Sequence, residues 1–526
     1  MMNRTLLLPL AALSSACAPG PTPATPSPEP SPAVRQIPAA VPTPSPAPGD
    51  PFAWLEDIEG ERSLDWVRAQ NVRSLGTLQS DPRYQRMHDH ALRIAEATDR
   101  IAFPAFRAGM IYNFWQDPSH VRGILRRTTL ASYRTDAPAW ETVLDLDALS
   151  ASEGANWVYK GMNCLEPEHR RCLIALSNGG KDASELREFD TRAKAFIIDG
   201  FRLPESKGGA AWVDENTLLV SRDFGEGTLT TSGYPFVVKR LTRGQALAEA
   251  TEVFRGKPDD VSVSAFTVRD ADGQLQAVMI SRGITFYEGE YWLPRAGLPP
   301  VRLPFPARTS IRGLVDDQLV FSTESDWNGF RVGDLLAYDL GALKDDPQGA
   351  KPYLILRPGP RESIEGVTTT RNRLVVVLNE NVKGAAYAYR RSAGAWVRDR
   401  LPMPGNATIG LGSSSDENDL LFLTTSNYLT PNSLMLADAA ANTVVKVKGM
   451  PERFDAAHLV TEQFEATSAD GTKVPYFVTR PRSMQLDGNN PTLLYGYGGY
   501  QVSLLPGYSG ITGKLWLEDG GVYVVA

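Results

Sequence analysis

Short apolar runs alternate with polar turns through the middle of the chain, from about residue 101 to residue 454. Residues 215–227, 316–329 and 371–391, for example, each contain two apolar runs around a polar loop, the pattern of two strands. No long stretch of helical spacing interrupts this pattern. So many short strands favour a propeller over one large sandwich, and at roughly 45–50 residues per four-stranded blade about seven blades fit.

Helical spacing precedes the β-rich region. In residues 57–71, Leu64 and Val67 lie on one helical face, and residues 81–99 carry a second apolar stripe at helical spacing that contains Tyr84, Met87, Ala91 and Ile94. We therefore predict an N-terminal helical segment over residues 50–100, followed by a propeller over residues 101–454.

The pattern changes again after residue 454. Asp470-Gly471 separates two strand patterns and indicates a hairpin. Thr492–Tyr495 has the pattern of a short buried strand, and a last strand, residues 522–526, follows Gly520-Gly521. We expect this last strand to be unpaired and residues 456–526 to be loosely held, because the backbone groups of a free strand need neighbours.

Charge and composition narrow the function classes. The chain has 526 residues and a formal net charge of -7, and no basic cluster stands out. Nucleic acid is therefore not expected as a partner. No apolar run is long enough to span a bilayer, so any contact with a membrane is expected only through the N-terminus.

The N-terminus has the features of an export signal. Arg4 precedes an apolar run over Leu6–Leu13, and small residues precede Cys17. We predict a lipoprotein-like signal peptide over residues 1–16, with the lipid on Cys17 of the mature protein; ordinary cleavage beside an incidental cysteine is the alternative. The proline-rich residues 17–49 are then expected to form a disordered tether. With the signal peptide and the lipid, this predicts a protein in the periplasm that is anchored to the outer membrane.

The two remaining cysteines, Cys164 and Cys172, lie close together in the sequence. In an oxidising compartment they are candidates for a disulfide. Glu166, Glu168 and His169 lie between them, and these residue types can bind a metal ion. This spacing matches no standard zinc pattern, and no metal or other cofactor is expected.

Four segments together resemble the prolyl oligopeptidase family of serine peptidases. They are DPFAWLEDIEGERSLDWVRAQN, SNGGKDASELREFD, ATSADGTKVPYFVTRP and PTLLYGYGGYQVSLLPGYS. The resemblance extends from Asp50 to the last residue. It implies a mostly β fold, in which a seven-bladed propeller is inserted between an N-terminal helical segment and an α/β-hydrolase domain. The helical segment is expected to pack on the hydrolase domain. Residues 455–526 would be the beginning of that domain. If the chain were instead a propeller lectin or scaffold unrelated to peptidases, YGYGG and the N-terminal segment would match the family only by coincidence.

The resemblance also implies an activity. A serine attacks the peptide bond, a histidine moves the proton, an aspartate orients the histidine, and nearby donors bind the oxyanion. The propeller restricts access to short peptides, and the family preference is for cleavage after proline. Short peptides are therefore the expected partners.

The catalytic serine, aspartate and histidine of the family have no counterparts in this sequence. No G-x-S-x-G motif is present, and the nearest match, around Ser509, lacks the final glycine. The five histidines, none of which matches the family's catalytic position, are His88, His90, His120, His169 and His458. We expect an incomplete hydrolase domain and a chain that is inactive alone. The alternative is an exported, non-catalytic propeller that acts as a binding module, or a truncated gene product.

One residue of the active site is expected within the chain. The second tyrosine of YGYGG, Tyr497, corresponds to the family's tyrosine whose hydroxyl contributes to the oxyanion hole. The surrounding glycines permit tight turns. The alternative is a buried structural tyrosine.

Overall fold

The computed structural model describes residues 50–57, 59–498 and 502–526. The predicted signal peptide, Cys17 and the tether lie outside the described residues. The chain divides into two compact units, of which residues 96–526 form the larger and the preceding helices belong to the smaller. Each unit is described by itself, so the predicted packing of the helical segment on the hydrolase domain stays a prediction.

The smaller unit contains the two helices that the sequence predicts. A short 3-10 turn, η2 (Ala53–Glu56), precedes α1 (Glu61–Gln79) and α2 (Tyr84–Ala95). The Ser63 hydroxyl of α1 donates a 2.7 Å hydrogen bond to the Trp54 carbonyl. Trp54 also meets Trp66 edge-on, with ring centroids 6.2 Å apart, so the turn folds back onto the helix.

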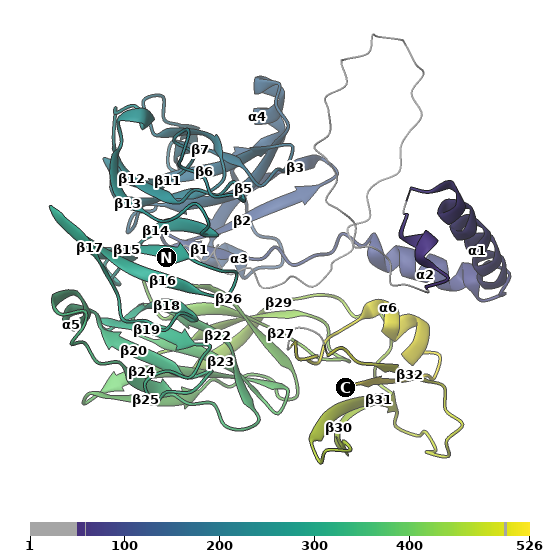
Figure 1. The fold of residues 1–526 in the computed structure, drawn as a ribbon. Coiled ribbons are helices and arrows are strands. Elements are labelled where there is room, and N and C mark those ends of the chain that lie inside the picture. The colour runs from purple at the N-terminus through teal and green to yellow at the C-terminus, as the bar shows by residue number, and fades with distance from the viewer. Residues whose placement is uncertain (1–49, 58, 499–501) are drawn as a thin grey trace, which may run out of the picture. The chain divides into compact units, whose positions relative to one another are not determined.

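Seven consecutive β-sheets make up most of the larger unit (Figure 1). Blade 1 consists of β1 (Ala105–Arg107), β2 (Met110–Asp117), β3 (His120–Thr129) and β4 (Glu141–Asp145), and blade 2 of β5 (Trp157–Cys164), β6 (Arg171–Asn178), β7 (Ser184–Asp190), β8 (Ala195–Phe196) and β9 (Arg202–Ser206). Blade 3 consists of β10 (Gly209–Asp214), β11 (Thr217–Ser221), β12 (Val237–Thr242) and β13 (Thr251–Arg255), and blade 4 of β14 (Ser262–Arg269), β15 (Leu275–Gly283), β16 (Gly289–Arg295) and β17 (Leu298–Arg302).

Blades 5 to 7 each have four strands, as blades 1, 3 and 4 do, whereas blade 2 has a fifth strand, β9, that pairs with β7. Blades 5 to 7 consist of β18 (Thr309–Val315), β19 (Gln318–Thr323), β20 (Leu335–Asp339) and β21 (Tyr353–Leu356); β22 (Glu362–Thr369), β23 (Leu374–Glu380), β24 (Lys383–Ser392) and β25 (Ala395–Arg400); β26 (Thr408–Ser414), β27 (Leu420–Ser426), β28 (Ser433–Asp438) and β29 (Thr443–Gly449). Short helices interrupt the strands at α3 (Leu130–Tyr133), α4 (Leu146–Glu153), η3 (Leu247–Glu249) and α5 (Leu340–Asp345). The seven predicted blades are confirmed.

The first strands of the blades surround the propeller axis. β14 contacts β10 and β18, β22 contacts β18 and β26, and β26 contacts β1. Strands within a blade are antiparallel, so the turns that follow the first strands all lie on one face of the ring, here called the distal face. The beginnings of the first strands, and the turns between second and third strands, lie on the opposite, proximal face.

Apolar packing between neighbouring blades holds the ring together. Leu374 to Leu378 of β23 are all fully buried, because a blade packs on each side of this strand. Blades 1 and 7 close the ring through side chains, without a shared strand. Phe106 stacks on Phe422 with ring centroids 4.8 Å apart, and the Phe106 N–H donates a 2.9 Å hydrogen bond to the Ser413 hydroxyl.

A separate mixed sheet follows the propeller. β30 (Leu459–Thr467), β31 (Lys473–Pro481), β32 (Thr492–Tyr495) and β33 (Val522–Val525) are arranged in the order β30-β31-β33-β32, and α6 (Gly510–Thr512) with the π-helical turn η5 (Gly513–Leu517) precedes β33. The expectation that the last strand is unpaired is wrong. β33 pairs antiparallel with β31 and parallel with β32, and Val522 and Val525 are buried.

This C-terminal sheet packs on the proximal face of blades 6 and 7. Tyr428 of blade 7 is buried with Phe477 and Val525 of the sheet. The Gln463 side-chain amide donates a 2.9 Å hydrogen bond to the Asn381 carbonyl of blade 6. The contacts lie at the turns between second and third strands, which defines the side of the propeller that a site on the sheet would face.

Candidate active site

The parallel pair of strands positions the YGYGG loop. β32 and β33 run in the same direction, so their carboxyl ends lie at one edge of the sheet. The Ala526 N–H donates a 3.0 Å hydrogen bond to the Tyr495 carbonyl, and a Cβ at Gly496 would lie 3.8 Å from the Ala526 carbonyl oxygen. The loop thus begins at the carboxyl ends of both strands, which is where open α/β sheets bind their ligands.

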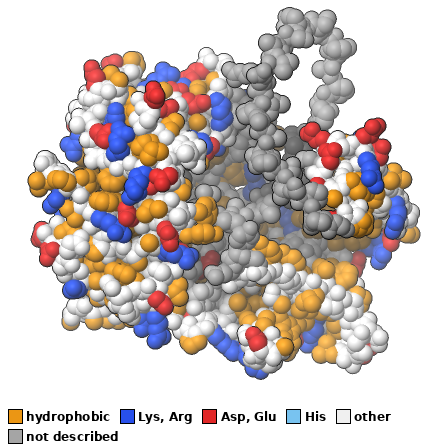
Figure 2. Space-filling model, viewed as in Figure 1, with side chains coloured by type: hydrophobic (Ala, Val, Ile, Leu, Met, Phe, Trp, Pro, Cys, Tyr) orange, Lys and Arg blue, Asp and Glu red, His pale blue; other side chains and the backbone are white. Residues whose placement is uncertain are grey.

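Tyr497 lies on this loop and is 49 % exposed. Its hydroxyl makes no hydrogen bond within the described ranges. The phenol is therefore exposed, whereas the structural alternative expects a buried tyrosine. Leu493, Leu494 and Tyr495 of β32 are also exposed, and Figure 2 shows hydrophobic side chains gathered over this sheet.

The chain that follows the loop reaches the propeller. Leu504 packs against the cluster that contains Tyr428 and Phe477. The Thr408 hydroxyl, at the beginning of β26, donates a 2.6 Å hydrogen bond to the Pro506 carbonyl. Tyr497 thus lies in the stretch of sequence between the carboxyl edge of the sheet and the proximal face of the propeller.

Ser509 caps a helix. Its hydroxyl accepts a 3.2 Å hydrogen bond from the N–H of Thr512, the last residue of the short helix α6, and lies 2.9 Å from the Thr512 hydroxyl. This local role accounts for a serine between two glycines.

The β2–β3 turn brings a serine, a histidine and an aspartate together, but in the wrong arrangement for a catalytic triad. Ser119 Oγ and His120 Nδ1 lie 2.7 and 3.0 Å from the same oxygen of Asp117, and the serine lies 3.1 Å from that same ring nitrogen. A triad needs the serine and the aspartate on opposite nitrogens. The hydrogen bond from Ser119 holds the pKa of Asp117 well below its usual range, which fits an acceptor that organises a turn.

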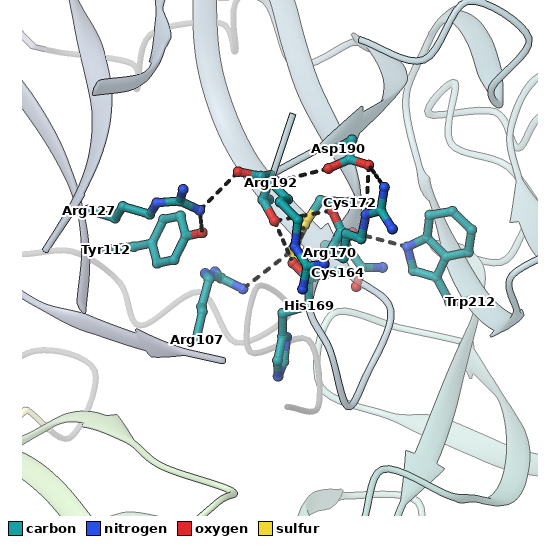
Figure 3. Close-up of a disulfide and its surroundings, with 12 residues drawn as sticks. Arg107, Tyr112, Arg127, Cys164, His169, Arg170, Cys172, Asp190, Arg192 and Trp212 are labelled. Carbon is teal, nitrogen blue, oxygen red and sulfur yellow. Dashed lines mark hydrogen bonds and ion pairs between the residues drawn. A yellow bond between two sulfur atoms is a disulfide. The ribbon is translucent and has the colours of Figure 1, made fainter. Parts of the chain in front are cut away.

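None of the other four histidines belongs to the loop. His88 and His90 belong to α2, and His458 precedes β30. His169 is buried, and its Nε2 lies 3.2 Å from Asp416 Oδ2. Figure 3 shows His169 beside the disulfide that joins Cys164 to Cys172. Among the described residues, no group of three or more His, Cys, Asp or Glu side chains is placed to hold a metal ion.

Sequence reasoning missed a buried ion network around Glu188, in the segment of residues 177–190. Glu188 is 1 % exposed and accepts two hydrogen bonds from Arg243, at 2.8 and 3.0 Å, and one from Arg171 at 3.1 Å. Burial alone raises the pKa of this carboxyl, but the hydrogen bonds from Arg243 and from the Phe201 N–H outweigh it and keep the pKa below its usual range. The alternation of charged and apolar residues in SELREFD was the available signal.

Charges elsewhere are mixed in sign. On the face drawn in Figure 2, acidic and basic side chains are interspersed over the propeller blades. No helix in the described part of the chain is both long and apolar enough to cross a membrane.

Comparison with known proteins places the propeller and the C-terminal sheet in one family. The family profile described as "Prolyl oligopeptidase, N-terminal beta-propeller domain" matches residues 32–449. An uncharacterized peptidase, y4nA, of Sinorhizobium fredii is 44 % identical over 91 % of this chain and 67 % of its own length. The prolyl endopeptidase of Elizabethkingia meningoseptica is 36 % identical over 90 % of this chain and 65 % of its own length.

A solved structure has the same architecture. The post-proline cleaving enzyme from Rickettsia typhi superimposes with a TM-score of 0.75 at 27 % identity, over 90 % of this chain and 71 % of that protein. The present chain thus spans about two thirds of the length of the relatives that it matches.

Proposed function

The chain belongs to the prolyl oligopeptidase family of serine peptidases, and from this premise we propose that it forms the propeller and oxyanion-binding part of a peptidase that hydrolyses short peptides after proline. The placement of Tyr497 carries the proposal. Its loop begins at the carboxyl ends of two parallel strands, and the following residues contact the propeller. Peptides bound there would be covered by the proximal face, which limits their size.

Tyr497 would act during formation of the tetrahedral intermediate. A phenol O–H donates a hydrogen bond to the oxygen on which negative charge develops, and this stabilises the transition state without adding a full charge to the site. The serine, histidine and aspartate that complete the reaction are not assigned to any residue of this sequence. They would come from the part of the relatives' length that this chain does not span.

The relatives' names support the substrate class. The Elizabethkingia relative is called a prolyl endopeptidase and the Rickettsia typhi structure a post-proline cleaving enzyme. We extend the same preference to this protein.

The proposed location is the periplasm, with Cys17 lipidated. A Cys17→Ser variant would then lose fatty-acid labelling.

The first test uses residues 1–526 alone. We predict no hydrolysis of a Gly-Pro anilide, because no residue of this sequence is assigned as the nucleophile. The matched positive control is the product of the whole gene, which should cleave the anilide and be blocked by a serine-directed inhibitor. Inhibitor-sensitive turnover by residues 1–526 would show that the nucleophile lies within this sequence and would refute the prediction. No turnover by the whole product would favour the alternative, a non-catalytic binding module.

A further inference from the structure

A cavity of about 530 Å³ lies at the distal end of the propeller axis. The first strands of four blades end around it and contribute Thr267 of β14, Arg312 of β18, Thr369 of β22 and Ser414 of β26. Glu166, from the β5–β6 turn of blade 2, also lines it. Because residues from five blades meet here, we place the cavity at the distal opening of the ring. It also extends outward over blade 6, where Arg390 and Arg391 of β24 and Trp396 of β25 line it.

The β5–β6 turn reaches across this opening. Residues 165–170, here called the plug, touch a blade on each side. His169 Nε2 lies 3.2 Å from Asp416 of blade 7, and a Cβ at Gly273 of blade 4 would lie 2.8 Å from Pro167. Blades 4 and 7 lie on either side of blade 2 and are not adjacent to it. A turn that contacts both therefore spans the opening between them.

A second contact ties the far side of the opening together. The Arg371 guanidinium of blade 6 lies 2.6 Å from Asp272 of blade 4 and donates a 3.2 Å hydrogen bond to the Ala271 carbonyl. Both segments are turns that follow first strands. The distal opening is therefore bridged from blade 4 to blade 6 as well as by the plug.

The plug is held firmly at its base. A disulfide joins Cys164, at the end of β5, to Cys172, near the beginning of β6, and Cys172 is fully buried (Figure 3). The Leu165 N–H donates a 2.9 Å hydrogen bond to the Arg171 carbonyl, and Arg170 pairs with Asp190 at 2.7 Å. A loop that is covalently closed and hydrogen-bonded at its base loses little further entropy by lying across the opening.

We propose that the plug closes the axial channel of the propeller at the distal face. Given the proposed function, peptides then reach Tyr497 only from the proximal side, between the propeller and the C-terminal sheet, and not through the propeller. The disulfide makes this closure dependent on an oxidising compartment.

Reporter thiols test the closure without any need for peptidase activity. In a Cys17→Ser background, Thr267→Cys places a thiol in the cavity, and Ser119→Cys places a matched thiol on the exposed β2–β3 turn of the proximal face. With the plug intact, a maleimide carried on polyethylene glycol should modify the cavity thiol at least about a hundredfold more slowly than the exposed thiol. Intact mass under non-reducing conditions verifies the disulfide.

Opening the plug should remove this difference. Replacing Cys164 and Cys172 by serine should raise the modification rate of the cavity thiol at least about tenfold and leave that of the exposed thiol unchanged. His169→Ala, which keeps the disulfide and removes the contact with Asp416, serves if the double variant does not fold. Equal rates for the two thiols with the plug intact, or no effect of either plug variant, would overturn the proposal. Failure of the peptidase assay would leave these rates untouched, so the two proposals fail separately.

Discussion

Glu188 shows how much a single buried side chain can contribute to this fold. Its carboxylate is fully enclosed and is paired with Arg171 of β6 and with Arg243, in the turn that follows β12. A buried carboxylate of this kind could not be predicted from the sequence, because charged residues are usually exposed and their partners here lie up to 55 positions away. The sequence did identify the segment, SNGGKDASELREFD, but not what its charges do.

Glu188→Gln should destabilise the protein by about 3 kcal/mol, because it leaves two arginines without their buried counter-charge. The pKa of Glu188 is lowered in the fold, so its contribution is complete above the unfolded pKa of about 4.3 and is lost as the pH falls through the lower folded value. The difference in unfolding free energy between wild type and variant, from urea titrations, should therefore shrink below about pH 4. Glu205→Gln, which removes an exposed pair with Lys181, is the control. A pH-independent difference would contradict this account.

At the scale of elements, the strands were predicted better than their pairing. The apolar run of residues 522–526 identified β33, but the sequence could not show that this last strand enters between β31 and β32. Pairing between strands distant in sequence depends on tertiary packing, which local pattern does not encode. The placement of β33 between its neighbours also gives Tyr497 its position, because the carboxyl edge of the parallel pair exists only in the folded sheet.

Gly513 tests the packing that precedes β33. A Cβ at this position would overlap the Phe454 ring, so Gly513→Ala must displace the turn η5 or the ring. We expect a loss of about 1–3 kcal/mol, measured by thermal or urea unfolding. Gly507→Ala is the control, because its added Cβ would lie 3.9 Å from the nearest atom, the Leu505 carbonyl oxygen. This variant should change the free energy of unfolding by less than about 0.5 kcal/mol. Equal effects of the two variants would show that this contact does not constrain the segment.

At the scale of the whole molecule, repetition made the propeller predictable. Regular strand and turn spacing gave the number of blades, because each blade is a local antiparallel unit. The closure of the ring was not predictable, since blades 1 and 7 meet across some 300 residues without a shared strand. The same holds for the plug, whose contacts with blades 4 and 7 appear only when the ring has formed.

Phe422→Ala should weaken this closure. The side chain is fully buried against Phe106 and Tyr133, and its loss leaves a cavity between the first and last blades. We expect a destabilisation of about 3–5 kcal/mol in urea titrations. The control is Phe286→Ala, which truncates a 70 % exposed ring and should cost less than about 0.5 kcal/mol. A small effect at Phe422 would mean that the ring is not held at this junction.

The most direct test of the central claim is kcat for cleavage of a proline-containing peptide by the product of the whole gene, with cleavage sites mapped by mass spectrometry. Cleavage should follow proline, and Tyr497→Phe, which removes one oxyanion donor, should lower kcat about a hundredfold with little change in KM. Tyr476→Phe in β31 is the matched control and should leave kcat within about twofold. An unchanged kcat in Tyr497→Phe, or cleavage without regard to proline, would contradict the account.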